Sequence, residues 1–271
     1  MSVGWIKNIS DETLLRDLLI PGTHDTMTGP CQKRYYKTQT LSLSEQLEAG
    51  VRYLDIRLTR DLYAAHREWK SDIGGETILE TLKDFLNRNP EEFVLVRFQN
   101  ANEKKDDFDR YCPALKGLVG RYSDLFFGFS SAQKEKISEL TVGRLRGKVL
   151  AFECSPHEYE ATRAGALHWA YPWHDCPGLA IQDLWDGPAV EEKIAAVTNA
   201  LDCPAWKDRL VLNHISATNG EPGYPDAYAA VLNETVLRGV RDLAAGSGRL
   251  AGVLIFDFVT EEIAEKIIKK G

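Results

Sequence analysis

The sequence predicts an α/β protein, an irregular or distorted (β/α)8 TIM barrel that forms a single domain over residues 1–271. Short apolar runs alternate with amphipathic stretches, which is typical of a mainly parallel sheet whose strands are linked by helices. Roughly six to eight such units follow one another without a Gly-x-Gly-x-x-Gly or Walker loop, and this favours a closed barrel. One barrel of about 250 residues also suits the length of the chain.

Buried strands are predicted wherever short runs of Val, Ile, Leu and Phe occur. The clearest runs are Val51–Leu58, Phe93–Phe98, Lys148–Phe152, Leu179–Leu184, Arg209–Ile215 and Gly252–Phe258. Two weaker runs are Leu18–Ile20 and Leu62–Ala65. The segment HWAYPWHDC (168–176) is interpreted as an aromatic loop packed on the barrel, because its histidines and cysteine match no standard zinc spacing.

Helices are predicted between these runs from apolar residues repeated at helical spacing. Glu76–Asn89 gathers its apolar residues on one face and stops before Pro90. Ser42 and Glu45 have the spacing of a capping box, which predicts a helix start there. The remaining helical patterns cover Ala189–Leu201, Asp226–Leu243 and Thr260–Lys270.

Composition excludes several classes of protein. The chain has 33 Lys and Arg against 40 Asp and Glu, a net charge of −7, so binding to nucleic acid is not expected. No apolar stretch approaches about 18 residues, and Met1–Arg16 does not resemble a signal peptide. The compartment stays open, either cytoplasmic or secreted with a signal removed. Five cysteines without a Cys-x-x-Cys pair favour buried free thiols, with one disulfide as the alternative, and we expect a monomer.

Titratable side chains stand at the ends of nearly all the predicted strands. They are His24, Asp25, Asp55, Arg57, His66, Arg97, Glu153, Asp183, His214 and Asp257. The carboxyl ends of parallel barrel strands meet at one mouth, so we expect these groups to converge there. Two histidines and an arginine suit phosphodiester cleavage: one imidazole removes a proton, the other donates one, and the guanidinium stabilises charge on phosphorus. For His214, pocket lining and core packing are equally good interpretations.

Several motifs carry a resemblance to a known family. LIPGTHDT (Leu19–Thr26), GVRYLDIRL (Gly50–Leu58) and NPEEFVLVRF (Asn89–Phe98) resemble the X-domain of phosphatidylinositol-specific phospholipase C, with the single-domain bacterial and fungal type as the best likeness. IQDLW (Ile181–Trp185) and LIFDF (Leu254–Phe258) continue the match toward the C-terminus.

The resemblance implies a role for each motif residue. His24 would be the general base for the inositol 2-hydroxyl, and His66 the general acid for the leaving diacylglycerol oxygen. Arg57 would bind the phosphate, Asp257 would hold His24, and Asp25 would pair with His66. The products would be diacylglycerol and inositol 1,2-cyclic phosphate, formed by intramolecular attack.

The resemblance also implies a head-group pocket without a cofactor. Asp55, Arg97 and Asp183 would bind inositol hydroxyls, and Trp185 would stack on the sugar. We expect no metal, because the Arg57 guanidinium occupies the region where calcium-dependent relatives hold their cation.

Three departures from the family pattern bear on substrate choice. His66 lies in AAHREW instead of the usual His-Gly surroundings, and the strand end Glu153–Cys154 lacks an arginine. The rim stretches Cys31–Lys37 and Thr218–Asp226 contain tyrosines but not the tryptophans that dock relatives on bilayers. Lys33, Arg34 and Lys37 are therefore interpreted either as a peripheral contact for anionic lipid or as a solvated charged helix.

Two other functions remain open from the sequence. The same catalytic groups could act on a soluble or non-inositol phosphodiester in a biosynthetic pathway, or the barrel could be a catalytically silent binding module. The presence of both His24 and His66 beside Arg57 disfavours the silent barrel. A glycerophosphodiesterase is disfavoured because its His-Arg-Gly opening is missing.

Overall fold

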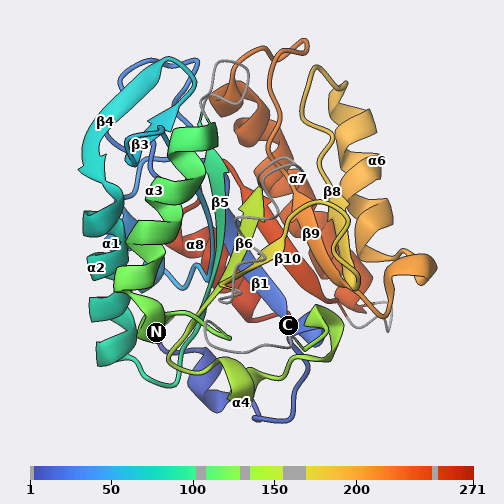
Figure 1. The fold of residues 1–271 in the computed structure, drawn as a ribbon. Coiled ribbons are helices and arrows are strands. Elements are labelled where there is room, and N and C mark those ends of the chain that lie inside the picture. Colours follow the sequence, from blue (N-terminus) through green and yellow to red (C-terminus); the bar gives the residue numbers. More distant parts are fainter. Residues whose placement is uncertain (1–2, 102–107, 129–134, 155–168, 246–249) are drawn as a thin grey trace.

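A computed structural model of the chain describes residues 3–101, 108–128, 135–154, 169–245 and 250–271. Eight parallel strands form the centre of the molecule (Figure 1). They are β1 (Leu19–Thr23), β2 (Tyr53–Leu58), β5 (Val94–Asn100), β6 (Val149–Cys154), β7 (Ala170–Pro172), β8 (Leu179–Gln182), β9 (Leu210–His214) and β10 (Gly252–Phe256). The predicted α/β class and distorted barrel are confirmed.

The sheet runs in the order β7-β6-β5-β2-β1-β10-β9-β8. The last strand, β10, pairs in parallel with the first, β1, from Leu19 opposite Gly252 to Thr23 opposite Phe256. The prediction of a fully closed barrel was wrong. In the described part of the chain, the row of hydrogen-bonded strands ends at β7 on one side and at β8 on the other. Only three residues form β7, so it offers little backbone for a second partner.

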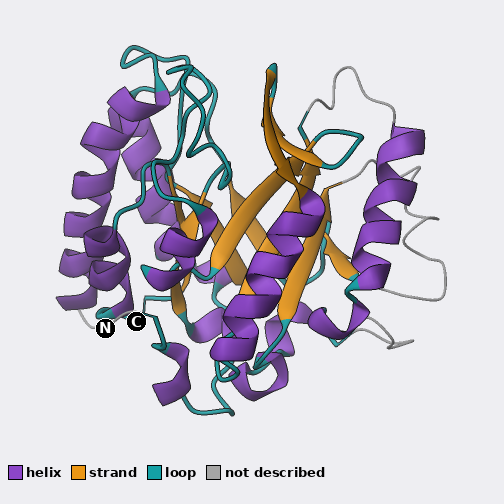
Figure 2. Cartoon of the chain, turned by 90° about the vertical axis from the view of Figure 1, so that its left-hand side faces the viewer, coloured by secondary structure: helices purple, strands orange, loops and turns teal. Residues whose placement is uncertain are grey.

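Helices surround the curved sheet on its outer side (Figure 2). They are α1 (Leu43–Glu48), α2 (Gly75–Arg88), α3 (Phe108–Arg121), α4 (Val142–Leu145), α6 (Val190–Leu201), α7 (Pro225–Ala245) and α8 (Glu261–Ile268). Short 3-10 turns cover Ile6–Asn8, Leu15–Asp17, Ser123–Leu125, Ile137–Glu139 and Pro204–Trp206. The predicted capping box is present, since Ser42 and Glu45 each bond the backbone of the other. In the described residues no helix combines the length and apolarity needed to cross a membrane.

Two segments differ from their predicted structures. The Leu62–Ala65 run is not a barrel strand: β3 (Tyr63–His66) and β4 (Trp69–Gly74) form an antiparallel hairpin on the end of β2. Periodicity alone could not show whether a short apolar run pairs in parallel or folds back. The aromatic segment after residue 168 contributes β7, which was interpreted as loop, and His168 lies outside the described residues.

Side chains alternate between the two faces of the barrel strands, and this alternation places the site. On β2, Leu54 and Ile56 pack outward with the core that contains α2, whereas Tyr53 packs inward with Leu95 and Phe152. Asp55 and Arg57 have the same parity as Tyr53, so they project into the barrel above it. The five cysteines, all of them in the described residues, are thiols outside any disulfide; four are buried, as predicted, and Cys203 is half-buried.

Candidate active site

His24 and Asp257 lie side by side because each follows the end of its strand. Thr23 of β1 is in register with Phe256 of β10, so the next residues of both strands are neighbours. The Nδ1 atom of His24 and Oδ1 of Asp257 are 2.7 Å apart. The His24 backbone donates from its amide to the Phe256 carbonyl at 3.0 Å, which locks the strand end. Two distant parts of the sequence therefore hold one imidazole.

Arg57 occupies the middle of the site. Its Nη2 atom lies 2.8 Å from Nε2 of His24, its Nε lies 2.9 Å from Oδ1 of Asp25, and Nη2 lies 3.0 Å from Oδ2 of Asp55. A guanidinium can only donate, so Nε2 of His24 accepts and carries no proton. The single imidazole proton then sits on Nδ1 and is donated to Asp257. This is the tautomer that a general base requires at Nε2.

His66 reaches the same carboxylate from the hairpin. Its Nε2 lies 3.3 Å from Oδ2 of Asp25, which is also 3.2 Å from Nε2 of His24. The Nδ1 atom of His66 donates to the Tyr36 carbonyl at 2.8 Å. The two imidazole rings are 6.4 Å apart between centroids and nearly perpendicular, at 78°. Because Nδ1 already carries a proton, the contact of Nε2 with Asp25 needs a second proton on one of those two atoms.

The backbone at Asp25 is unusual and directs its carboxylate into the site. Its φ angle of 42° lies in the left-handed region that non-glycine residues seldom adopt. The conformation is held from both sides, since the Asp25 amide donates to Oδ2 of Asp55 at 3.2 Å and the Thr26 amide donates to the Asp55 carbonyl at 2.9 Å. Strain of this kind persists where the surroundings fix it, often at functional sites.

Burial and the neighbouring charges set the protonation of the site. Burial lowers the pKa of His24 well below 6.5, and the Arg57 guanidinium lowers it further. Burial also lowers the pKa of His66, although the Asp25 carboxylate opposes this. Burial raises the pKa of Asp25 and, more strongly, that of Asp257. His24 is thus a neutral imidazole in the free protein, and the Asp25–His66 pair shares a proton.

Asp55 and Arg97 lie deeper than the resemblance suggested. Burial would raise the pKa of Asp55, but the Arg57 and Arg97 guanidiniums outweigh it and hold that pKa far below its usual value. Arg97 lies 3.6 Å from Oδ1 of Asp55 and stacks 4.0 Å above the ring of Trp173. Asp55 is fully buried, and its two oxygens face two different arginines. This placement favours support of Arg57 over direct contact with a substrate hydroxyl.

Asp183, Trp185 and His214 form one side of the mouth. Nδ1 of His214 is 3.8 Å from Oδ1 of Asp183, and its ring lies 6.0 Å from that of His24. His214 is fully buried and burial lowers its pKa to about 4, so it is a neutral imidazole. Trp185 is 37% exposed. The centre of its ring lies 5.7 Å from the guanidinium of Arg67, and Arg67 is at the tip of the β3–β4 hairpin. An exposed aromatic ring here is available to a ligand.

Several supporting residues were missed by the sequence analysis. Gln39 donates from Nε2 to the carbonyls of His24 and Phe256, both at 2.9 Å, and ties the two strand ends together. The thiol of Cys154 lies 3.5 Å from Arg97 and 3.4 Å from Nε2 of His174. Gln39 stands in an irregular loop where no periodic pattern could indicate its role.

Three residues of the site carry the kinds of donor atom that bind a metal ion. His24, Asp25 and Asp55 each offer a ligand atom, and these atoms lie within 4.8 Å of one another. All three residues already contact the Arg57 guanidinium, a permanent cation that cannot be deprotonated at working pH. A second cation in the same space would be repelled. The donor set therefore fits the arginine better than a metal ion.

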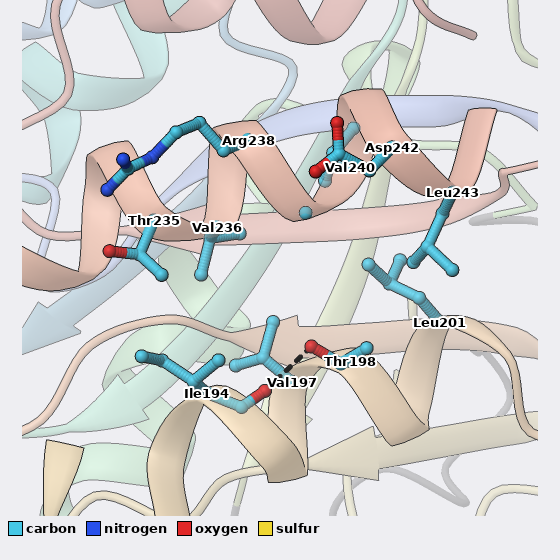
Figure 3. Close-up of a pocket in the computed structure, with 11 residues that line it drawn as sticks. Ile194, Val197, Thr198, Leu201, Thr235, Val236, Arg238, Val240, Asp242 and Leu243 are labelled. Atoms are coloured by element: carbon cyan, nitrogen blue, oxygen red, sulfur yellow. Dashed lines mark hydrogen bonds between the residues drawn. The ribbon is translucent and has the colours of Figure 1, made fainter. Parts of the chain in front are cut away.

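A separate groove lies on the outside of the barrel. Ile194, Val197 and Leu201 of α6 face Val236, Val240 and Leu243 of α7 across a cavity of about 330 Å³ (Figure 3). Its lining contains none of the predicted site residues. The candidate active site lies instead at the barrel mouth, where polar groups from the ends of β1, β2, β8, β9, β10 and from the hairpin converge.

A parallel α/β barrel with two imidazoles around one half-buried arginine defines a class of barrel enzyme that works by acid–base catalysis. The family model described as PI-PLC X 1 matches residues 16–119. The chain is 33% identical to the 1-phosphatidylinositol phosphodiesterase of Listeria monocytogenes, over 98% of this chain and 84% of that protein. It belongs to the phosphatidylinositol-specific phospholipase C family.

Other relatives and solved structures agree. The 1-phosphatidylinositol phosphodiesterase of Staphylococcus aureus is 23% identical over 94% of this chain and 87% of that protein. The solved phosphatidylinositol-specific phospholipase C from Listeria monocytogenes superposes with a TM-score of 0.88 at 31% identity, covering all of this chain and 98% of the other. A Staphylococcus aureus structure at 20% identity, with a TM-score of 0.79 and coverage of 99% and 97%, shows the same fold.

Proposed function

We propose that the protein cleaves phosphatidylinositol to diacylglycerol and inositol 1,2-cyclic phosphate. The observation that carries this proposal is the shared contact of both imidazoles with Asp25, beside the Arg57 guanidinium. Two relatives named 1-phosphatidylinositol phosphodiesterase support the substrate class.

The first half of the reaction uses His24. Its Nε2 removes the proton from the inositol 2-hydroxyl while Asp257 stabilises the imidazolium that forms. The hydroxyl oxygen attacks phosphorus, and a neighbouring hydroxyl is favoured over water by its high effective concentration. Arg57 exchanges its contact with His24 for the non-bridging phosphate oxygens, where a planar fork donates two hydrogen bonds. Substrate binding itself therefore frees the base.

The second half uses His66 and Asp25. The bond between phosphorus and the glycerol oxygen breaks, and that oxygen takes the proton shared by Nε2 of His66 and Asp25. Tyr36 holds the other nitrogen of His66 through its carbonyl, which keeps Nε2 directed at the site. Asp183 and Trp185 would contact the inositol ring, and the buried His214 would lie behind Asp183.

Peripheral contact with a lipid surface is part of the proposal, because a related Staphylococcus aureus structure is described as a study of membrane binding. Tyr35 and Tyr224 are 39% and 40% exposed, and their rings lie 6.0 Å apart. Tyr36, in the same loop as Tyr35, holds His66. Exposed amphipathic rings beside the mouth suit the interfacial region of a bilayer.

For Lys33, Arg34 and Lys37 the interpretation as a solvated charged helix was wrong. Residues 34–36 form a turn, not a helix. Arg34 is paired with Asp226 at 2.9 Å, and Lys37 donates to the carbonyls of Gly29 and Cys31. The charges of Arg34 and Lys37 are therefore already paired with groups of the protein. Tyr35 and Tyr224 are the stronger basis for lipid contact.

The deciding experiment is incubation with phosphatidylinositol vesicles and, separately, with glycerophosphoinositol, both in EDTA, followed by phosphorus NMR. Cyclic phosphate from the lipid is the expected result. Cyclic phosphate from the soluble diester alone would replace the lipid with a soluble substrate. No product from either would contradict the proposal and favour a silent barrel.

A further inference from the structure

Lys193 is a buried cation that the mechanism does not use. It lies in the buried stripe of α6 with Val197 and Ala200, where a lysine is out of place, and its side chain is fully buried. Its ammonium donates to the Leu184 carbonyl at 2.6 Å and to Oε1 of Gln182 at 3.4 Å. Burying a charge is costly without such partners, so its contacts define what it stabilises.

Those contacts hold the turn that leaves β8. Oε1 of Gln182 also accepts from the Leu184 amide at 2.7 Å, so both polar backbone groups of Leu184 are held. Nε2 of Gln182 donates at 2.8 Å to Oδ1 of Asn213 and to the His214 carbonyl. The segment Asp183–Trp185 is therefore anchored through its middle residue to β9 and to α6.

Helix α6, which carries Lys193, is itself held in place by its neighbours. The Val197 carbonyl accepts from Nδ2 of Asn213 at 2.9 Å, which ties α6 to β9. On its other side, α6 lies along α7, with Ile194 and Leu201 directed at that helix (Figure 3). If the Asp183–Trp185 segment shifted, Lys193 could not follow it, and its ammonium would lose partners inside the protein.

Two carboxylates that follow strand ends, those of Asp183 and Asp257, influence the charge of Lys193. The carboxylates of Asp183 and Asp257 favour the charged ammonium, whereas burial lowers the pKa of Lys193 to about 8. The positive charge of Lys193 also lowers the pKa of His214, at the end of β9. On the α7 side, Arg238 and Asp242 line the neighbouring groove.

We propose that Lys193 is a positioning residue that fixes the Asp183–Trp185 segment at the barrel mouth and thereby sets the affinity for the inositol head group. The assignment of this segment to the head group rests on the proposed function. Among the described residues, Lys193 donates its hydrogen bonds to Gln182 and to the Leu184 carbonyl and to neither imidazole nor Arg57, so we expect its larger effect on binding of the head group.

The first test compares Lys193→Met with Lys207→Met, a matched change at an exposed lysine that follows α6. Lys193→Met should raise both KM and the calorimetric Kd for inositol 1,2-cyclic phosphate about tenfold, the effect of one charge-assisted hydrogen bond. Its kcat should change less than about threefold. An unchanged Kd, or a loss confined to kcat, would overturn the proposal.

The second test does not depend on activity. Amide hydrogen exchange at 183–186 should be faster in Lys193→Met than in wild type and unchanged in Lys207→Met. Equal protection in all three proteins refutes the positioning role, whatever the substrate. If wild type cleaves no inositol lipid but the exchange difference is present, the proposed function fails while the positioning of this segment stands.

The third test uses wild type alone and serves if the methionine variant does not fold. As pH rises through about 8, Lys193 loses its proton and donates weaker hydrogen bonds, so Kd for the cyclic phosphate should weaken on the alkaline side. A Kd that stays flat from pH 7 to pH 9 contradicts the proposal.

Discussion

Arg57 donates a hydrogen bond from Nη2 to Nε2 of His24 over 2.8 Å, and this contact decides where the His24 proton lies. Nε2 is left with a lone pair, and Nδ1 keeps the proton and donates a hydrogen bond to Oδ1 of Asp257 at 2.7 Å. The free protein is thus already in the protonation state that deprotonates a hydroxyl. A phosphate that attracts Arg57 would uncover this base.

Asp257→Asn should lower kcat by about 10²–10⁴-fold, because an amide can donate to Nδ1 and favour the wrong tautomer. Steady-state turnover of phosphatidylinositol measures the loss, and a thermal unfolding midpoint near that of wild type shows that the fold persists. Asp242→Asn on the outer surface of α7 is the matched control. Retention of more than about a tenth of wild-type kcat would argue against the tautomer role.

Arg57→Lys should lower kcat by about 10²–10³-fold, since a point charge cannot donate two parallel hydrogen bonds to phosphate while still contacting Asp25. Steady-state turnover of phosphatidylinositol measures this loss of kcat as well. Arg34→Lys provides the control, because Arg34 pairs with Asp226 at the rim and is 60% exposed. A mild effect at position 57 would mean that charge alone is sufficient.

Chelation should leave turnover unchanged. His24, Asp25 and Asp55 are held by Arg57, and we expect no metal to be required. Initial rates in EDTA should match those with added calcium within about twofold. Turnover that disappears with EDTA and returns with calcium would contradict this expectation.

The pH dependence of kcat/KM should be bell-shaped with its optimum on the acid side of neutrality. His24 acts as the neutral base, and its pKa is lowered by burial and Arg57, so activity falls only when pH drops below that lowered value. His66 acts with its proton, and its pKa is also lowered by burial, so activity declines as pH rises through it. An optimum above pH 8 would be inconsistent with these assignments.

Tyr35→Ala combined with Tyr224→Ala should weaken activity on phosphatidylinositol vesicles about tenfold or more and leave turnover of glycerophosphoinositol unchanged. Loss of exposed ring area affects only a substrate held in a bilayer. Tyr63→Ala is the matched control, because Tyr63 is 38% exposed on the hairpin. Equal loss on both substrates would indicate damage to the site instead of to membrane contact.

Much of the fold could be predicted from local sequence. The apolar runs of β2, β5, β6, β9 and β10 are long enough to identify buried strands, and the capping box of α1 is complete within four residues. The three-residue β7 offers no such pattern. The β3 run is apolar like a barrel strand, but its antiparallel pairing depends on β4 and on the end of β2.

The unusual position of Lys193 could have been recognised from the sequence. It stands at a position of α6 where the buried stripe requires an apolar residue, and a lysine there predicts buried polar partners. The partners themselves, on the turn after β8, could not be named from the sequence.

The sequence by itself determined the strand ends and the residue types placed there, because alternation and helical periodicity are local properties of the chain. It could not determine that Asp55 and Arg97 pair with each other beneath Arg57, that Gln39 joins His24 to Phe256, or that the described strands leave the barrel open between β7 and β8. Those arrangements come from the register of β1 against β10 and of β2 against β5, which join residues up to 233 positions apart. Burial of the joined charges then set their protonation, and only the folded structure supplies that environment.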